Sequence, residues 1–543
     1  MITKAIGIVL LVSLLVFLPA HFVGAAQKFD LVVYGGTAGG VITAVSAARE
    51  GLKVALLEPR DHLGGMVSGG LSATDYGKKE VIGGYSFEFF WRLGSHYNTR
   101  QFGDDVAWYF EPHVAEAVFK EMLSEVGVHV LFRHRLREKT GVRKVGVQIV
   151  EIFVEDGSSF EAKVFADCSY EGDLMAQSGV TYTWGREGMD QYGESLAGVR
   201  EKTPFHQFTV DISPFDSRGR PLPEVSAEPG GKIGSGDRKV QAYNFRMIMT
   251  RDRNNQVPFP KPQHYDPARY ELLARMLKAQ EAKLGRAPTV EELCNPIPIP
   301  NGKTDTNNNG AFSTDFIGRS YDYPEGDYST RERIWQEHVD YVAGFFYFLA
   351  HDPQVPPALH KEINEWGLAR DEFTDTDHWP NQLYIREARR MVGEYVMIQK
   401  DLQTDLTKPD PIGMGSYNSD SHNIQRVVSP EGFVVNEGDV EVPVTPYQIP
   451  YRVLLPKKTQ ARNLLVPVCF SASHVAYSSL RMEPQYMIMG HAAGVAAKMA
   501  IDKGIPVQDV DAAALTRRLL EQGTVIEYKP GPPPPTWKGL KER

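Results

Sequence analysis

A glycine-rich turn near the start of the chain has the composition of a phosphate-binding loop. It consists of Gly35, Gly36, Thr37, Ala38, Gly39 and Gly40. Glycines allow a tight turn and let backbone N–H groups approach a pyrophosphate closely. Small and apolar residues follow at helical spacing over 41–50, so the positive end of a helix dipole should face the same group. The turn therefore predicts that the chain binds a dinucleotide.

An acidic residue, Glu58, follows at the spacing expected for a ribose contact. It ends an apolar run over 53–58, 18 residues beyond Gly40, and a carboxylate at this place accepts hydrogen bonds from a ribose diol. In the pattern G-x-G-x-x-G, Gly35 and Gly40 fit, but Thr37 holds the middle position. We expect its Cβ to displace the phosphate slightly and its hydroxyl to compensate. The alternative is a strand–turn–helix unit that binds no ligand.

Histidines and arginines in the second half of the chain could bind an acidic group or move a proton. The four that we single out as catalytic are Arg386, His422, His474 and Arg481. Arg386 shares a strand-like stretch with Arg389 and Arg390, and His422 lies beside Asp420 in a loop rich in Gly, Ser and Asn. Such side chains bind a carboxylate or an alkoxide, or move a proton while hydride is transferred. The alternative for the arginines is a solvated or ion-paired face, and for the histidines a position outside the active site.

The residues after the acidic strand favour FAD over NAD as the dinucleotide. This segment contains Pro59, Arg60, Gly64, Gly65 and Met66. A glycine pair just after the acidic strand lets the chain run close to the adenosine ribose and the pyrophosphate. The elements expected next are a helix over 112–126, a strand over 127–131, a β-meander over 145–154 and a strand over 163–168. Val130 is expected to present its backbone to the adenine, and a domain that binds only NAD needs neither the meander nor the returning strand.

A second glycine-rich and alanine-rich helix is expected near the C-terminus, over 484–502, after a buried strand over 463–468. Met482 and Pro484 lie at its start, where proline costs no hydrogen bond. Small residues such as Gly490 let another backbone approach this helix closely. Its N-terminus can stabilise the negative charge that a reduced flavin gains.

The chain resembles bacterial FAD-dependent oxidoreductases, distant relatives of the fumarate reductase and succinate dehydrogenase flavoproteins. The segments that carry the resemblance are 34–40, 62–66, 167–173, 471–476 and 479–484. The resemblance covers most of residues 29–525 and implies an α/β fold, with a GR2-type Rossmann-like FAD-binding domain split by an inserted α+β substrate domain. It also implies that Asp167, Gly172 and Asp173 contribute to the FAD site. It implies redox chemistry without defining a substrate.

The expected domain organisation follows from this resemblance and from the composition. The segments are a signal peptide at 1–26, a first FAD-binding part at 27–204, an inserted substrate or cap domain at 205–380, connecting strands and active-site loops at 381–460, a C-terminal FAD-binding part at 461–526 and a Pro-rich tail at 527–543. In the insertion, Asp266 should cap a helix over 267–284, and another helix is expected over 330–350.

The first 26 residues have the pattern of a secretory signal peptide. Lys4 precedes an apolar run over 5–20, and small residues precede an expected cleavage after Ala26. The alternative is an uncleaved anchor. We therefore expect a periplasmic or secreted protein without a stable membrane span after cleavage.

The composition excludes several function classes. The net charge of the 543 residues is −9, so no strong positive field is available to hold nucleic acid. The three cysteines lie far apart, which excludes a cysteine cluster for iron and sulfur, and we expect no metal cofactor.

Three local patterns have weaker interpretations. Asp305 with two following asparagines could bind a cation, but a polar turn is favoured. Residues 302–304 resemble the end of a P-loop, but Ile297 stands where its first glycine should be. His62 could form a covalent bond to flavin, although its surroundings do not match the fumarate reductase motif.

Taken together, these patterns predict an exported FAD-dependent oxidoreductase that transfers hydride between a small organic substrate and FAD. His422 or His474 would move the proton, Arg481 would support negative charge, and electrons would pass to a further acceptor. Two alternatives use the flavoprotein fold only as a scaffold: a carbohydrate-active lyase or hydrolase, and a non-catalytic binding protein. Neither a G-x-S-x-G nucleophile elbow nor an identifiable carboxylate pair supports the first.

Overall fold

The computed structural model of the chain describes residues 25–102 and 105–530, and its central feature is a mixed sheet. The strand order is β3-β2-β1-β6-β5-β4, and β20 pairs with β6. The bounds are β1 Gln27–Tyr34, β2 Val54–Glu58, β3 His129–Phe132, β4 Val142–Val145, β5 Gln148–Phe153, β6 Ser159–Asp167 and β20 Leu464–Leu465. Strands β1, β2, β3, β6 and β20 are parallel, and β4 and β5 form the antiparallel meander. The expected α/β class is confirmed.

The apolar residues of β1 alternate between two cores because successive side chains point to opposite faces of a sheet. Leu31 and Val33 pack in the larger core, with residues of the helices on one face. Val32 and Tyr34 pack in the second core, which includes Ile149 of the meander. Both faces are therefore covered, as expected for a strand that is apolar at every position.

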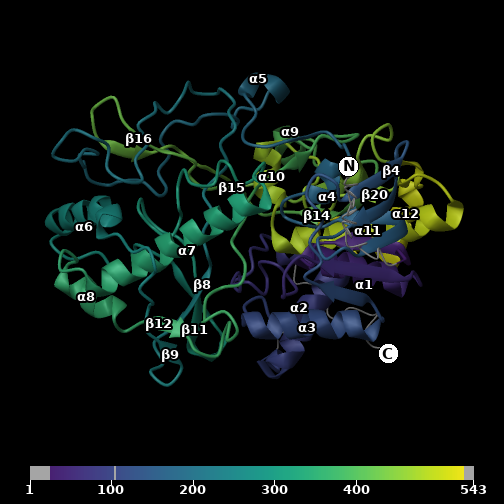
Figure 1. The fold of residues 1–543 in the computed structure, drawn as a ribbon, viewed down its shortest axis with the longest axis horizontal. Coiled ribbons are helices and arrows are strands. Elements are labelled where there is room, and N and C mark those ends of the chain that lie inside the picture. Colours follow the sequence, from purple (N-terminus) through teal and green to yellow (C-terminus); the bar gives the residue numbers. More distant parts are fainter. Residues whose placement is uncertain (1–24, 103–104, 531–543) are drawn as a thin grey trace, which may run out of the picture.

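Seven helices of the described residues accompany this sheet. They are α1 Ala38–Arg49, α2 Gly84–His96, α3 Pro112–Glu125, α4 Asp173–Gln177, α10 His474–Leu480, α11 Glu483–Lys503 and α12 Ala512–Glu521. Figure 1 shows α1, α2, α3 and α11 grouped on the side of the molecule that carries the sheet. The expected bounds of α3 and α11 agree with these to within a few residues.

Helices α1 and α11 approach each other closely because both carry glycine at the contact. A Cβ at Gly490 of α11 would overlap the carbonyl oxygen of Gly39 in α1. A Cβ at Gly494 would lie 2.6 Å from the Cβ of Ser46. The Ser46 hydroxyl also donates a 2.9 Å hydrogen bond to the carbonyl oxygen of His491. This contact joins the two ends of the chain's nucleotide-binding part.

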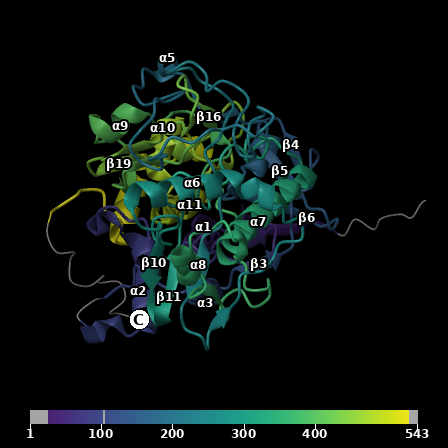
Figure 2. The same ribbon diagram turned by 90° about the vertical axis from the view of Figure 1, so that its left-hand side faces the viewer.

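A second, antiparallel sheet lies in the region expected to be inserted. Its order is β10-β11-β8-β12-β9. Helix α5 Met189–Tyr192 precedes this region. The elements within it are β8 Met247–Thr250, β9 Gln256–Val257, α6 Glu271–Leu284, β10 Pro296–Ile299, β11 Lys303–Thr306, α7 Tyr328–His351, α8 Pro357–Ile363 and β12 Gly367–Ala369. Figure 2 shows α6, α7 and α8 in front of the helices that cover the first sheet. The domain boundaries themselves stay predictions.

Short strand pairs connect this region to the C-terminal part. They are β7 Tyr182–Thr183 with β13 Arg390–Met391, β14 Pro411–Gly415 with β19 Tyr447–Pro450, β15 Ser419–Ser421 with β18 Val440–Val442, and β16 Arg426–Val428 with β17 Val434–Asn436. Helix α9 Gln399–Gln403 lies between β13 and β14. None of the helices within 25–102 and 105–530 is long and apolar enough to cross a membrane.

The structure corrects three local expectations. Of the basic stretch 386–390, only Arg390 lies in a strand, the short β13. Helix α10, which the sequence did not predict, precedes α11. Asp305 belongs to β11 rather than to a polar turn. Asp305 is buried, and Arg246 offsets the cost of burying its charge by contacting both carboxylate oxygens, at 2.7 and 2.8 Å.

The helix contact predicts that Gly490→Ala destabilises the protein. The added methyl group must push α11 away from the backbone of Gly39, which should lower the free energy of unfolding by about 1–3 kcal/mol. Urea unfolding followed by circular dichroism measures the change. Lys498→Ala, on the outer face of the same helix, is the matched control and should have little effect. Equal stability of G490A and the wild type would contradict the close packing.

Candidate functional site

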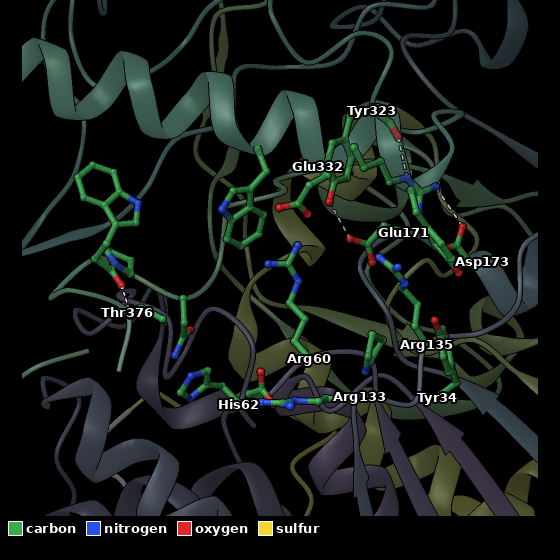
Figure 3. Close-up of a pocket in the computed structure, with 18 residues that line it drawn as sticks. Tyr34, Arg60, His62, Arg133, Arg135, Glu171, Asp173, Tyr323, Glu332 and Thr376 are labelled. Atoms are coloured by element: carbon green, nitrogen blue, oxygen red, sulfur yellow. Dashed lines mark hydrogen bonds and ion pairs between the residues drawn. The ribbon is translucent and has the colours of Figure 1, made fainter. Parts of the chain in front are cut away.

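A cleft of about 480 Å³ opens at the carboxyl ends of the parallel strands. Figure 3 shows its lining side chains, which come from the ends of several strands and from the helix that covers them. Tyr34 ends β1, Arg60 follows β2, Arg133 and Arg135 follow β3, and Trp335 comes from α7. In sheets of this type, ligands bind outside the carboxyl ends of the strands, so this is the expected place for a dinucleotide.

The glycine turn lies next to this edge and has little room for side chains. Gly35 has a φ of +97°, and a Cβ at Gly36 would lie 2.9 Å from a carboxylate oxygen of Glu58. Thr37 is the N-cap of α1, since its hydroxyl oxygen accepts a 3.2 Å hydrogen bond from the Gly40 N–H. The same hydroxyl donates to the carbonyl oxygen of Cys168 at 2.8 Å. Threonine in the middle position thus caps the helix, a role that the sequence reasoning did not assign to it.

Glu58 ties the turn to the end of β2. Its carboxylate accepts 2.7 Å hydrogen bonds from the backbone N–H groups of Gly36 and Arg60. Burial raises the pKa of Glu58 to about 7, although these two hydrogen bonds act in the opposite direction. A carboxylate has about four acceptor sites, so Glu58 can still accept hydrogen bonds from ribose hydroxyls.

The second glycine segment packs against the same turn. The Gly64 N–H donates to the carbonyl oxygen of Gly36 at 2.7 Å, and a Cβ at Gly65 would overlap the hydroxyl of Tyr170. The Met66 N–H donates to that hydroxyl at 2.9 Å. Pro59 and Arg60 line the cleft, whereas Val130 lies in β3 beside Leu56. Folding therefore brings most of the predicted FAD-binding residues to one edge of the sheet.

Arginine side chains and an aromatic ring surround the cleft. The Arg60 guanidinium lies 3.7 Å from the centre of the Trp335 ring. Arg133 and Arg135 pair with Asp61 and Glu155, at 2.5 and 2.6 Å. Arg60 in the cleft lining and the glycine N–H groups at the sheet edge suit an anionic diphosphate.

His62 also lines this cleft. Its Nδ1 lies 3.4 Å from Glu116, and its Nε2 lies 3.2 Å from Asp375. The hydrogen bond to Glu116 raises the pKa of His62 above its usual value. The covalent alternative for this residue stays untested.

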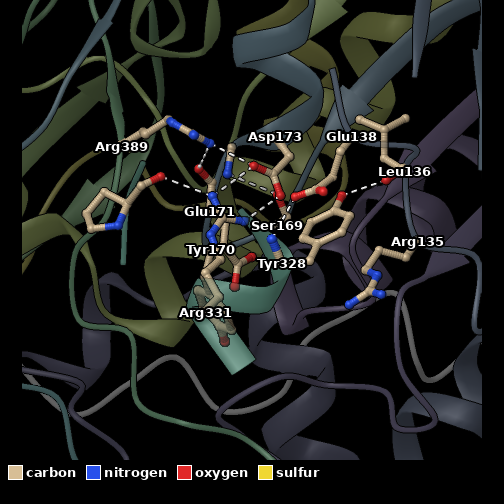
Figure 4. Close-up of polar contacts among 12 residues, drawn as sticks. Arg135, Leu136, Glu138, Ser169, Tyr170, Glu171, Asp173, Tyr328, Arg331 and Arg389 are labelled. Carbon is tan, nitrogen blue, oxygen red and sulfur yellow. Dashed lines mark hydrogen bonds and ion pairs between the residues drawn. The ribbon is translucent and has the colours of Figure 1, made fainter. Parts of the chain in front are cut away.

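Asp173 connects the sheet to the insertion, as Figure 4 shows. Its carboxylate binds the Arg331 guanidinium of α7 through two contacts, of 2.7 and 3.0 Å, and Arg389 at 2.7 Å. At the start of α7, the Tyr328 hydroxyl donates to the carbonyl oxygen of Leu136 at 2.6 Å. These contacts hold α7 over the cleft.

Asp167 and Gly172, which were also predicted to contribute to the FAD site, have structural roles. Asp167, at the end of β6, accepts hydrogen bonds of 2.7 Å from the Ser169 hydroxyl and the Met175 N–H. Burial raises the pKa of Asp167 to about 6. Gly172 precedes α4 with a φ of +69°, a conformation that favours glycine.

Polar atoms without hydrogen-bond partners lie at the start of α11. Met482 is the N-cap of this helix, and Glu483 and Pro484 are its first two residues. Tyr170 donates a 2.6 Å hydrogen bond to one carboxylate oxygen of Glu483. Among the described residues, the other oxygen has no hydrogen-bond partner, and neither does the side-chain amide of Gln485. Burial raises the pKa of Glu483 to about 8. Buried polar groups are normally paired, so these atoms fit a polar ligand at this helix end.

His422 and Arg386 meet through Asp315, a residue that the sequence reasoning missed. His422 Nδ1 lies 2.6 Å from one oxygen of Asp315, and Arg386 lies 3.1 Å from the other. Burial and the charge of Arg386 lower the pKa of His422 to about 4, so its ring is neutral at pH 7. Asp315 is 107 residues from His422 in sequence, and no spacing pattern signals the pair.

Arg481 lies between this pair and α11. It donates to the Tyr384 hydroxyl at 3.0 Å and to the carbonyl oxygen of Asp420 at 2.9 Å. Its Nε has no hydrogen-bond partner in the part of the chain that the structure describes. Arg481 thus has a free donor directly before the helix whose start carries the unpartnered atoms.

His474 occupies a different, buried ion network at the start of α10. Its Nδ1 lies 2.8 Å from Glu387, and its backbone N–H donates to Glu187 at 2.8 Å. Arg390 contacts both of these carboxylates. Burial and the charge of Arg390 lower the pKa of His474 to about 3. Arg386, Arg389 and Arg390 are therefore all paired with internal carboxylates, as the ion-paired alternative anticipated.

The comparisons with known proteins agree with this geometry. The model of a family described as FAD dependent oxidoreductase matches residues 30–519. The chain belongs to this family. Its description confirms FAD as the cofactor and oxidoreduction as the reaction class. The relation to fumarate reductase flavoproteins stays a prediction, and a search of curated proteins found no match.

Solved structures show only a distant likeness. An L-amino acid deaminase from Proteus vulgaris is 13% identical over 33% of this chain and 55% of that chain, with a TM-score of 0.22. An L-proline dehydrogenase from P. horikoshii is 14% identical over 30% and 59%, with a TM-score of 0.22. A thioredoxin reductase from T. acidophilum is 17% identical over 32% and 39%, with a TM-score of 0.17. The chain spans 39–59% of the length of these proteins, and the likeness supports no conclusion on substrate.

The Asp173 ion pairs predict a large stability effect for Asp173→Asn. Removing the charge leaves Arg331 without its carboxylate partner and Arg389 with Glu325 alone, which should lower the free energy of unfolding by about 3 kcal/mol at pH 7. Urea unfolding measures the loss. Asp509→Asn, which breaks an exposed pair with Lys458, is the matched control and should cost less than about 1 kcal/mol.

The stability difference between the wild type and D173N should depend on pH. Burial tends to raise the pKa of Asp173, but its two arginine partners outweigh burial and lower the pKa below the usual 3.8. The stabilisation is therefore complete above about pH 5, one unit above the unfolded-state pKa, and is lost as the pH falls through the folded-state pKa. A difference between wild type and D173N that grows on acidification would contradict this assignment.

Proposed function

We propose that the protein is an exported FAD-dependent oxidoreductase that transfers hydride between a small organic substrate and FAD. The observation that carries this proposal is the joint position of the glycine turn, Glu58 and the cleft at one sheet edge. The family match across residues 30–519 supports the reaction class. Cleavage after Ala26 would place the mature chain in the periplasm or outside the cell.

The chain's own residues suggest how FAD would be held. The N–H groups of the Gly35–Gly40 turn and the N-terminus of α1 would bind the diphosphate. Glu58 would accept the ribose hydroxyls, and the start of α11 would meet the ring system with Glu483 and Gln485. Bound FAD would supply the capacity to accept or donate hydride.

His422 is the proton-transfer group that the geometry favours. Its ring is neutral, so one nitrogen can accept a proton, and Asp315 holds Nδ1 at 2.6 Å. This contact sets the orientation of the ring and leaves Nε2 directed to other partners. The free Nε donor of Arg481 would support negative charge close to α11. His474, 3% exposed and enclosed by carboxylates and Arg390, is better placed to stabilise the start of α10.

The cofactor assignment predicts that purified residues 27–543 show a visible flavin spectrum and release the flavin on acid precipitation. Glu58→Ala should leave a folded protein with a lower flavin content, because a ribose contact is lost. Absorbance and circular dichroism measure the two properties. Glu228→Ala, at an exposed position in the insertion, is the control.

Three results would change the assignment. Unchanged flavin content in E58A would refute the ribose contact. Colour retained in the acid pellet would indicate a covalent link and favour His62. A colourless protein that also fails to bind added FAD would overturn the proposed function.

The two histidines are predicted to differ in their effects. His422→Gln should keep the flavin and slow its reduction by about 100-fold, because proton transfer is lost. His474→Gln should instead lower stability and change the reduction rate by less than about threefold, since it disturbs the buried hydrogen bond between the neutral ring and Glu387. Anaerobic bleaching with a substrate found in a screen measures the rates. Slow reduction in H474Q together with normal reduction in H422Q would assign the proton transfer to His474.

A further inference from the structure

A second cavity, of about 270 Å³, adjoins His422 and is strongly acidic. It lies between the β15–β18 strand pair and the segment before and after β10 and β11. Its lining includes the carboxylates of Glu291, Asp420, Asp439 and Glu441. None of the described residues that line it is a lysine or an arginine.

The strand register brings two of these carboxylates together. Asp420 of β15 pairs directly with Glu441 of β18. Like charges at directly opposed positions destabilise an antiparallel pair. Burial, together with repulsion from Asp420, raises the pKa of both Asp439 and Glu441 above the usual range. The fold therefore tolerates an electrostatic cost at this place.

The cavity's own contacts do not remove this charge. The Arg481 guanidinium lies 3.6 Å from Asp420 and forms its hydrogen bond with the backbone of that residue. Asp439 accepts a 2.6 Å hydrogen bond from the neutral hydroxyl of Thr203. Within 25–102 and 105–530, Glu441 forms no ion pair with a lysine, arginine or histidine. The carboxylate of Glu441, which is exposed to solvent on one side, thus lines the cavity without a cation.

An independent observation points to a donor ligand. Asn308 is only 5% exposed and lines the same cavity. Its side-chain carbonyl oxygen, like that of Asn307, lacks a hydrogen-bond partner among the residues that the structure describes. A buried amide oxygen without a donor costs free energy unless a ligand supplies one.

The geometry favours an organic cation over a metal ion. In the described part of the chain, three His, Cys, Asp or Glu ligand atoms come within 4.8 Å of one another only at Glu111, His113 and Glu372, which lie elsewhere. The cavity also has room for several non-hydrogen atoms. The neutral ring of His422 at its wall does not repel a cation.

We propose that this cavity binds the ammonium group of a small organic amine, which is the substrate class of the enzyme. The carboxylates of Asp439 and Glu441 would balance the charge, and the amide oxygen of Asn308 would accept an N–H hydrogen bond. Four carboxylates line the cavity, and Arg386 beside it is paired with Asp315, so the site is poorly suited to an organic acid. This inference rests on the proposed function, since it identifies what His422 would act on.

Calorimetric titration of the flavin-loaded protein at pH 7 tests the proposal. The probes are butylammonium chloride, sodium butyrate and butanol, which share a chain and differ in charge. Butylammonium should bind, whereas butyrate and butanol should not. Glu441→Gln should weaken butylammonium binding by about threefold, because a solvent-screened charge contact is lost. Glu228→Gln, which removes an exposed carboxylate elsewhere in the insertion, should leave the affinity unchanged.

A stability measurement separates ligand binding from a structural role. Glu441→Gln relieves repulsion from Asp420, so it should raise the midpoint of thermal unfolding while it weakens binding. A lower midpoint would show that the carboxylate supports the fold and would overturn the proposal. Butyrate binding, or no binding of butylammonium, would also overturn it. Binding of calcium chloride that E441Q abolishes, without butylammonium binding, would identify a metal site instead.

The flavin spectrum of the same samples separates this inference from the proposed function. A yellow protein that does not bind butylammonium refutes the substrate class and leaves the oxidoreductase assignment intact. A colourless protein that does not bind FAD refutes the proposed function, whatever its affinity for amines.

Discussion

The contact between α1 and α11 is the constraint on which the rest of this structure depends. Gly39 and Gly490 allow the two backbones to approach, although 451 positions separate them in sequence. This contact places the glycine turn before α1 near the start of α11. The turn assigned to the diphosphate and the polar groups assigned to the ring system lie at these two helix ends. A larger residue at the contact would separate the phosphate-binding turn from the polar atoms of Glu483 and Gln485.

The insertion completes this arrangement through charge rather than through apolar packing alone. Asp173 comes shortly after strand β6 of the cofactor-binding sheet and binds Arg331 of α7 as well as Arg389. An aspartate with two arginine partners offsets the cost of burying the three charges. As a result, α7 lies over the cleft, with Trp335 against Arg60.

Charged groups in this protein fall into two kinds. Arg386, Arg389 and Arg390 are buried and paired with carboxylates, which makes them parts of the framework. The carboxylates of the cavity beside His422 are the opposite case, because Asp420 and Glu441 oppose each other across two strands. Unbalanced charge at a cavity is more informative about a ligand than balanced charge in a core.

The sequence by itself determined the parts of this protein that depend on neighbouring residues. The strand, turn and helix around Gly35–Gly40, the acid at Glu58, the β-meander and the long helix near the C-terminus follow from short-range periodicity and backbone freedom. The family model confirms the cofactor and reaction class that these motifs indicated. Such features can be predicted from the sequence because their physical causes act within a few residues.

Only the tertiary structure decided the partners of the charged side chains. Asp315 reaches His422 across 107 positions, and Glu387 reaches His474 across 87. The role of Thr37 as a helix cap tied to Cys168, and the opposition of Asp420 and Glu441, likewise depend on strand register and chain crossing. Electrostatic and hydrogen-bond energies depend on distance in space and on burial. Neither distance nor burial can be predicted from the spacing of residues along the chain.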